Sequence, residues 1–246
     1  MVPFRSNLAL IGARLSPAAA RGVLLLICCA LTIGAKLSAA DKRADVAPIV
    51  SAWLNAQTNI QTWTADVTQI RSFKNLLQPL TATGHVWFAA PNQFRWEIGN
   101  PPQTIALRKS DEMLVIYPRL KRAERYSFTT QPSGPWKDTL ALLEAGFPRN
   151  EADLTRQFKI SNISTSNQIC HLNLEPKSAS ARHMMPRLTV AFSTNDFVLR
   201  ATELQFADGS TMHNRFTNPK LNPPVDEKLF NPVLDGDIKI VEPMKR

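Results

Sequence analysis

Apolar and polar residues alternate along most of the chain after residue 62, a period of two that is typical of β-strands with one buried face. In the first half, this alternation predicts strands at 63–68, 80–88, 94–98, 104–108, 113–117 and 122–129. In the second half it predicts strands at 158–164, 169–174, 188–193, 199–206, 211–216 and 238–241. Turn-forming Pro, Gly, Asn and Asp residues separate the first six, as in an antiparallel meander.

Helical periodicity is confined to short segments. The first covers residues 45–55, with Asp45 as its N-cap and one apolar face formed by Val46, Ile49, Val50, Trp53 and Leu54. A second, at 135–146, places Trp136, Leu140 and Leu143 in an amphipathic helix. Asn150 caps a further turn that runs to Arg156, and a last turn is predicted at 226–230. These elements predict a mainly β fold with short helices, in which helices are inserted between the halves of one large, strongly curved antiparallel sheet.

The first forty residues have the composition of a targeting segment. They hold four basic residues and no acidic one, and an apolar run between Gly22 and Ala35 is followed by the small residues 38–40. This order predicts a secretory signal peptide (1–40) that is cleaved after Ala40, which leaves a single domain at 41–246. The apolar run is short for a transmembrane helix, and an uncleaved N-terminal anchor is the alternative.

Removing this segment changes the electrostatic picture. The whole chain of 246 residues has 29 basic and 20 acidic side chains and a net charge of +9, which suggests a nucleic-acid partner. Without the four basic residues of the signal peptide, 25 basic side chains remain against 20 acidic ones, and the charge falls to +5. That is mildly basic, so no nucleic-acid partner is expected. Cys28 and Cys29 leave with the signal peptide, so Cys170 has no intrachain disulfide partner.

The sequence offers little catalytic chemistry. Its histidines lack the spacing of metal ligands, and no nucleophile-elbow, zinc-protease or phosphate-loop motif is present; they are His85, His171, His183 and His213. We therefore expect no metal site, no cofactor and no catalytic residues, although a secreted enzyme on a β-scaffold remains an alternative. Cys170 lies in a predicted strand as a small buried side chain. The basic run 119–122, with Arg125, predicts a solvated hairpin tip, or alternatively a docking patch for an acidic partner or anionic lipid headgroups.

Aromatic residues are concentrated in the first half of the predicted sheet. They are Trp63, Trp87, Phe88, Phe94, Trp96, Phe128 and Trp136. Trp87 and Phe88 are adjacent in one strand, so they point to opposite faces of the sheet. A filled core explains this pattern, and so does a ligand cavity on a curved sheet that short helices cover as a lid.

The segment Gly84–Glu97 adds a specific signal. Its Gly-x-Val-Trp-Phe-x-x-Pro-x-x-Phe-x-Trp pattern resembles the signature of the periplasmic outer-membrane lipoprotein carriers, the LolA family. The segments 101–105 and 114–118 continue the resemblance. The segments 207–211, 215–218, 221–222 and 229–232 resemble the family's closing strands, so the resemblance spans nearly all of 45–241.

The resemblance implies an incomplete barrel that carries lipoprotein acyl chains in an apolar cavity, without enzymatic activity. In that family the cargo comes from an inner-membrane ATP-driven lipoprotein-releasing complex, crosses the periplasm and reaches an outer-membrane acceptor. A monomer with acylated lipoproteins as cargo is therefore expected. An envelope-stress sensor that binds lipid, or a dedicated lipid or glycolipid carrier of the same fold, are the alternatives.

Candidate site residues follow from the motif and from the aromatic pattern. The expected acyl-chain cavity comprises Trp63, Trp87, Phe94 and Trp96. The expected lid covers 133–156 with Trp136, Leu140 and Leu143, and the expected turn and gating residues are Pro91 and Arg95. One position departs from the family, because Ala90 stands where well-studied members have an arginine that latches the lid.

Overall fold

The computed structural model describes residues 47–109, 112–127 and 146–242. The predicted signal peptide 1–40 and the lid residues Trp136, Leu140 and Leu143 lie outside the described residues. Residues Asp45–Arg246 form one compact unit, and the fold of that unit positions the candidate site.

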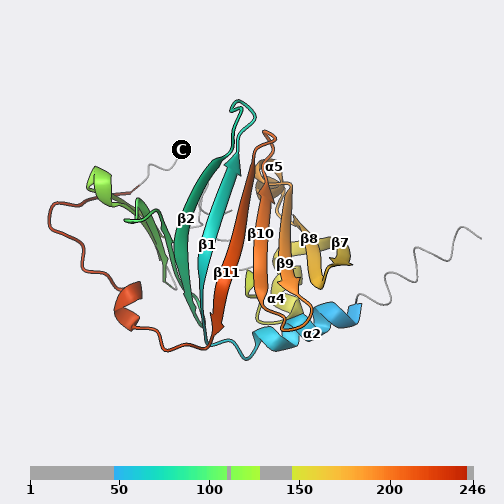
Figure 1. Cartoon of the computed structure of the whole chain (residues 1–246). Helices are drawn as coiled ribbons and strands as arrows, with labels where there is room; N and C mark the ends of the chain where they lie inside the picture. Colours follow the sequence, from blue (N-terminus) through green and yellow to red (C-terminus); the bar gives the residue numbers. More distant parts are fainter. Residues whose placement is uncertain (1–46, 110–111, 128–145, 243–246) are drawn as a thin grey trace, which may run out of the picture. The chain divides into compact units, whose positions relative to one another are not determined.

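Twelve strands of the described residues form a single sheet, in the order β12-β6-β5-β4-β3-β2-β1-β11-β10-β9-β8-β7 (Figure 1). In the first half the strands are β1 (Thr62–Ser72), β2 (Leu80–Ala89), β3 (Gln93–Ile98), β4 (Thr104–Arg108), β5 (Glu112–Tyr117) and β6 (Arg122–Ser127). In the second half they are β7 (Phe158–Ser166), β8 (Ile169–Pro176), β9 (Arg187–Ser193), β10 (Leu199–Gln205), β11 (Thr211–Leu221) and β12 (Lys239–Val241). Neighbouring strands are antiparallel, except that β12 pairs with β6 in parallel.

Strand β1 joins two meanders into this sheet. It pairs with β2 on one side and with β11 on the other, so that Ile70 lies opposite both Thr81 and His213. The end strands β12 and β7 do not pair with each other, and the sheet is curved but not closed. The expected strongly curved antiparallel sheet, an incomplete barrel, is therefore confirmed.

The alternation of the strands gives the sheet an inner and an outer face. In β1 the side chains of Trp63, Ala65 and Val67 are buried on the inner face, where they join the main apolar core. The helix α2 (Ala47–Gln57) packs on this core, because Trp53 stacks on Phe192 of β9 with ring centroids 4.7 Å apart. The helix α4 (Glu151–Gln157) adds Leu154 to the same core.

Gly84 of β2 is required by the close approach of β3. A Cβ atom at this position would lie 1.8 Å from the Glu97 carbonyl oxygen, closer than any real contact allows. The glycine at the start of the aromatic motif therefore lets the two strands that carry the motif pair without a bulge.

The C-terminal residues 222–241, here called the strap, follow the outer face to the far edge of the sheet. The 3-10 helix η2 (Glu227–Phe230) is fixed there because Arg95 Nη1 donates to the Leu229 carbonyl at 2.7 Å. Leu234 and Ile238 then pack on a second apolar cluster, formed by Leu107, Ile116 and Ala123. The strap ends in β12, next to β6.

Local predictions agree with these elements in position but differ at several ends, and β11 runs to Leu221 rather than to residue 216. β1 extends to Ser72, well beyond the predicted residue 68, and α2 ends at Gln57 rather than at residue 55. The helix α5 (Ala179–Met184) was not predicted, because six residues are too few to show a helical period. The predicted cap at Asn150 is confirmed, since its side chain accepts from the Asp153 amide at 2.9 Å.

Candidate functional site: an aromatic cavity on the inner face

A cavity of about 560 Å³ opens on the inner face of the sheet. Most of its wall is apolar, contributed by Trp63, Phe73, Phe94, Trp96, Ile98, Ala106, Met113, Phe147, Met184, Leu199, Phe206, Met212 and Phe216. Its volume lies within the range of about 300–1,000 Å³ that is usual for small-molecule sites. Of the two interpretations that the aromatic pattern allowed, the structure contains the cavity.

One end of the cavity is built from aromatic rings. Strand pairing brings Trp63, Phe88 and Phe94 into line across β1, β2 and β3, because each lies at an inward position of its strand. Phe216 of β11 meets the edges of Trp63 and Trp96, with centroids 5.3 Å and 5.9 Å away. The rings form a rigid apolar wall whose shape is set by the register of four strands.

Phe147 divides this aromatic end from a second cavity of about 280 Å³. Its ring stacks on Phe88 at 4.5 Å and 7° and contacts Trp63 at 5.0 Å. Two residues on, Arg149 Nη2 donates to the Pro91 carbonyl and to Asn92 Oδ1, both at 3.2 Å. The segment that places Phe147 is thus tied to the turn between β2 and β3.

A row of polar side chains crosses the otherwise apolar inner face. Gln69 Nε2 donates to Asn214 Oδ1 at 3.0 Å, and Asn214 Nδ2 donates to Thr202 Oγ1 at 3.1 Å. The three residues lie side by side on β1, β11 and β10 and all line the cavity. Since each amide nitrogen has a second hydrogen, the row keeps donor capacity for a ligand.

Two indole nitrogens near the cavity are unpaired among the described residues. They belong to Trp63 and Trp96, two residues of the cavity wall, and both nitrogens are buried with no hydrogen-bond partner in this part of the chain. An unpaired buried donor costs free energy unless a ligand or water satisfies it. The cavity combines an apolar wall with the hydrogen-bond donors of the polar row, a combination that suits a long hydrocarbon carrying acceptor oxygens.

The opposite end of the cavity forms an open rim. Phe73 beyond β1 and Met184 of α5 line it while remaining 40% exposed each. Phe206, Asp208 and Arg71 complete this rim. The cavity thus runs from the aromatic end to a rim at the β1–β2 and β10–β11 turns.

The structure brings three of the four predicted cavity residues together: Trp63, Phe94 and Trp96. The placement of Trp87 in the cavity was wrong. Trp87 lies on the outer face, where its ring is 4.2 Å from that of His85 and 5.9 Å from the Arg95 guanidinium carbon. The motif identified Trp87 by sequence position, but alternation assigns the inner face to its neighbour Phe88.

The two predicted gating residues lie apart. Pro91 belongs to the β2–β3 turn, follows a cis peptide bond and lines the second cavity. Arg95 points to the outer face, where its Nε donates to Glu97 Oε1 at 2.7 Å in addition to its bond to Leu229. Of the predicted lid 133–156, the structure describes 146–156.

Sequence reasoning missed Phe147, Arg149 and the polar row. The polar row had a partial signal. Asn214 lies between the buried apolar Met212 and Phe216 at inward positions of its strand, and Gln69 follows the buried Val67 at the next inward position of β1. Phe147 had no such signal, since it lies outside any periodic segment.

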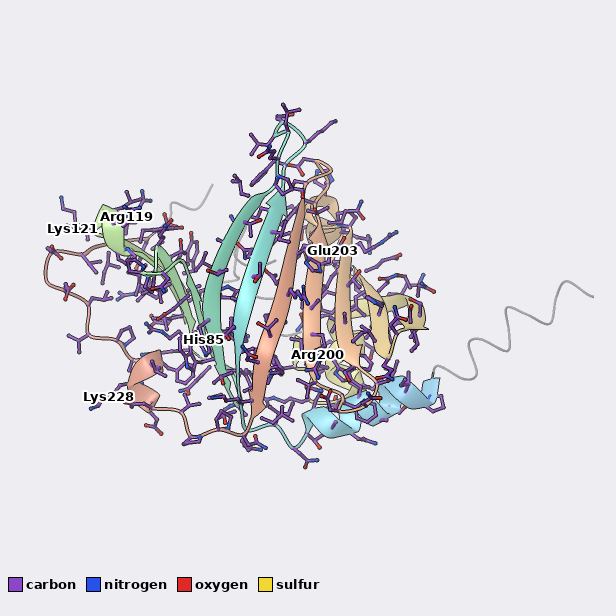
Figure 2. The ribbon with its side chains drawn as sticks, in the orientation of Figure 1. His85, Arg119, Lys121, Arg200, Glu203 and Lys228 are labelled. Carbon is purple, nitrogen blue, oxygen red and sulfur yellow. The ribbon has the colours of Figure 1, made fainter. Side chains whose placement is uncertain are left out.

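Polar interactions on the outer face link strands rather than form a site. Figure 2 looks onto this face, with His85 on β2 and Glu203 on β10 labelled. Asp66 accepts from Asn218 Nδ2 and bonds to His85 Nδ1, both at 2.8 Å. These hydrogen bonds, first from Asn218 and then from His85, lower the pKa of Asp66.

The basic run at the β5–β6 turn is an exposed hairpin tip, as predicted. The short helix η1 (Pro118–Leu120) forms it, and Lys121 bonds to Asp237 of the strap at 2.5 Å (Figure 2). Arg122 pairs with Glu124 at 2.8 Å.

The thiol of Cys170 and the groups that could ligate a metal can also be placed among the described residues. Cys170 is buried, and burial raises the pKa of its thiol, so it stays protonated and acts as a packing residue, as expected. Within 47–109, 112–127 and 146–242, no three His, Cys, Asp or Glu side chains cluster in a way that could hold a metal ion. No helix of these residues is both long and apolar enough to cross a membrane.

The family assignment follows from residues 58–233, which match the model of the family "Outer membrane lipoprotein carrier protein LolA". The match spans the aromatic motif, the cavity and most of the sheet. The chain belongs to the LolA family, as the motif at Gly84–Glu97 indicated. Among curated protein sequences there is no match.

Solved structures with the same kind of fold are distant in sequence. The chain is similar to a putative outer membrane lipoprotein-sorting protein domain from Vibrio parahaemolyticus, with 13% identity, a TM-score of 0.42, and coverage of 75% of this chain and 95% of that one. It is also similar to the Mycobacterium tuberculosis lipoprotein LppX, with 11% identity, a TM-score of 0.40, and coverage of 74% and 98%. MucB of Pseudomonas aeruginosa, in its complex with MucA, matches with 12% identity, a TM-score of 0.38, and coverage of 78% and 62%.

Proposed function

We propose that this protein is a non-enzymatic periplasmic carrier that encloses lipoprotein acyl chains and transfers them from the inner to the outer membrane. The aromatic-walled cavity on the inner face is the observation that carries this proposal. Each methylene group of an acyl chain gains about 0.8 kcal/mol on leaving water, so acyl chains need an apolar enclosure to cross an aqueous compartment.

The polar row gives the enclosure a preferred cargo. An acyl chain attached to glycerol carries ester carbonyls, which accept hydrogen bonds and donate none. Gln69, Asn214 and Thr202 offer donors at one level of the cavity, and the aromatic end extends beyond that level. Acylated lipoproteins fit this arrangement, with the ester groups at the polar row and the chains among Trp63, Phe94 and Phe147.

A carrier must also release its cargo, which requires a site that can open. The contacts of Arg149 with the β2–β3 turn are exposed hydrogen bonds, and such bonds break at little cost. In the family, an arginine at the position of Ala90 latches the lid. In this proposal Arg149 takes over that role, and it donates its hydrogen bonds to the β2–β3 turn instead of from it.

The route of the cargo is part of the same proposal. The signal peptide 1–40 directs export and is cleaved after Ala40, an inner-membrane ATP-driven lipoprotein-releasing complex loads the protein, and an outer-membrane acceptor unloads it. The protein acts as a monomer. No nucleic acid, cofactor or metal takes part.

The test compares two aromatic positions on opposite faces. Phe94→Glu places a charge in the cavity wall, and Trp96→Ala is the milder variant should the first fail to fold. Trp87→Ala is the matched control, because it removes an aromatic ring from the outer face. We expect both cavity variants to lose transfer of a lipoprotein to outer membranes and the control to keep it. Unaltered transfer by a folded Phe94→Glu protein would refute the proposal.

Native mass spectrometry of protein from the envelope fraction identifies the cargo. A co-purifying acylated polypeptide supports general lipoprotein carriage. A free glycolipid would point instead to a dedicated lipid carrier, and a bound tail of a membrane protein to an envelope-stress sensor.

A further inference from the structure

The turn between β1 and β2 exposes an unusual number of large apolar side chains. In this β1–β2 tip, residues 73–80, Leu77 is fully exposed, Leu80 and Leu76 are 55% and 49% exposed, and Phe73 is 40% exposed. Large apolar residues this exposed elsewhere in the described chain occur singly, or next to this tip in the case of Met184. Single exposed apolar residues are ordinary, but a contiguous group marks a binding surface.

The fold itself does not need these side chains. The tip is ordered by a turn in which the Leu76 amide donates to the Phe73 carbonyl at 3.1 Å, and Leu80 pairs with Arg71 in the ladder. None of its leucines belongs to an apolar cluster of the core. Exposed leucines lower the solubility of the protein and do not stabilise its core. We therefore expect these side chains to contact another molecule or a membrane.

The shape and charge of the tip favour a lipid bilayer over a protein groove. Figure 1 shows the β1–β2 hairpin projecting beyond the β10–β11 turn at this end of the sheet. Arg71 and Lys74 are basic, and the segment 71–80 contains no acidic residue. Convex apolar tips with basic neighbours enter the headgroup region of anionic membranes, where apolar burial and electrostatic attraction add.

The nearest acidic residue identified beside the tip has its own partners. Asp208 on the β10–β11 turn accepts from the hydroxyl and the amide of Ser210, at 2.6 Å and 2.9 Å. Those hydrogen bonds lower the pKa of Asp208, and the charge of Lys74 contributes to the same effect. Arg71 and Lys74 thus outnumber this carboxylate, and α5 adds the basic Arg182.

The tip is continuous with the rim of the cavity. Phe73 and Arg71 line that rim from the β1 side, and Met184 and Phe206 line it from the other. We propose that the β1–β2 tip inserts into the surface of an anionic membrane and sets the cavity rim against it. The use of this contact in cargo transfer rests on the proposed carrier function, but the membrane contact itself does not.

Vesicle flotation of the protein purified from the cell envelope tests this contact. The vesicles contain phosphatidylethanolamine and phosphatidylglycerol, or phosphatidylcholine alone. The variant Leu76→Ser/Leu77→Ser should bind the anionic vesicles at least about tenfold more weakly, since it removes two large apolar side chains. The matched control Leu120→Ser/Val233→Ser removes two residues that are 71% and 97% exposed elsewhere, and should bind as the wild type does. Lys74→Glu should weaken binding to anionic vesicles only.

A second measurement reports the position of the tip directly. The variant Leu77→Cys can be labelled with an environment-sensitive fluorophore, because Cys170 is buried. Its emission should rise and shift to the blue with vesicles, whereas a label on Val233→Cys should not respond. Equal vesicle binding by the wild type and the double-serine variant, or a silent label at residue 77, would overturn the proposal.

Binding of a soluble fluorescent fatty acid, without vesicles, separates this inference from the proposed function. Tip variants should bind the fatty acid as the wild type does, because Leu76 and Leu77 do not line the cavity. If the wild-type protein bound vesicles but not the fatty acid, the proposed carrier function would be refuted and the proposed membrane contact would stand. If the tip variant Leu76→Ser/Leu77→Ser lost binding to a protein acceptor but bound vesicles as the wild type does, the partner of the tip would be a protein. That result would overturn the inference.

Discussion

Phe147 is the residue on which the shape of the binding space most depends. Its ring forms the partition between the cavities of about 560 and 280 Å³, held between Phe88 and Trp63. A ring in such a place limits how far a hydrocarbon chain can extend toward the β2–β3 turn. The length of chain that fits is therefore limited by Phe147 together with Phe94 of β3, which also lines both cavities.

Replacing this ring should lengthen the preferred ligand. Phe147→Ala joins the two cavities, so we expect affinity for long acyl probes to rise several-fold relative to short ones. Lost packing should lower the free energy of unfolding by about 2 kcal/mol, less than for a fully buried phenylalanine. A series of fluorescent fatty acids and thermal denaturation measure the two effects. The control is Phe197→Ala, which removes a partly buried ring of the same core that lines neither cavity. If Phe147→Ala had the same chain-length preference as the wild type, Phe147 would not separate the two cavities.

At the residue scale, the sequence predicted the kind of site, an apolar cavity, better than it predicted which residues line it. The motif located Phe94 and Trp96 correctly, because their roles follow from inward positions in a strand. It misplaced Trp87, since similarity to a family pattern carries no information about which face a residue takes. Phe147 and Arg149 act through a connection whose path depends on the whole sheet, so no local pattern reveals them.

Among the elements, β1 has the central place, because both meanders hydrogen-bond to it. The outer-face bonds of Asp66 reinforce this joint: His85 is on β2, Asn218 is on β11, and the carboxylate between them is on β1. Three strands are thus linked by one ionised side chain that is 50% exposed.

The link should depend on pH in a defined direction. The pKa of Asp66 is lowered in the folded state, so its contribution is complete above the unfolded value of 3.8 and is lost as the pH falls through the lower folded value. Because the side chain is half exposed, Asp66→Asn should cost only about 0.5 kcal/mol at pH 7, a shift in Tm of about 1–2 °C. Thermal denaturation should show this shift at pH 7 and none near pH 2.5. Glu203→Gln, on the same face, is the control; an equal Asp66→Asn shift at both pH values would contradict the link.

The strand positions were predictable and their arrangement was only partly so. Alternation within each strand is local, and it located the strands with small errors at their ends. The pairing of β1 with β11 joins residues such as Ile70 and His213, which are far apart in sequence, and no period records it. The strand β12 was predicted, but its parallel pairing with β6 was missed for the same reason.

At the scale of the whole molecule, the strap reaches the edge of the sheet that lies farthest from β7. Leu234 and Ile238 cover the outer-face cluster of Leu107, Ile116 and Ala123, and Arg95 holds η2. The sheet is therefore covered on its inner face by helices and, near β4–β6, on its outer face by the strap.

Loosening the strap should expose this cluster while leaving the cavity intact. Leu234→Ser/Ile238→Ser should lower the free energy of unfolding by about 2 kcal/mol, because both side chains are only partly buried. Hydrogen exchange should become faster in 222–241, with fatty-acid binding unchanged. Val233→Ser, at a position 97% exposed, should leave the exchange of the strap as it is. Equal exchange in the double variant and the wild type would show that these contacts do not hold the strap.

Strand β12 also affects how separate copies of the protein meet. Without it, the part of β6 that pairs with β12, residues 122–124, would be a template on which a strand of another molecule could continue the sheet. With it, this part of the edge is a parallel strand of three residues that begins at Lys239, which is too short to be extended easily. Strand β12 thus protects this part of the sheet edge against edge-to-edge aggregation.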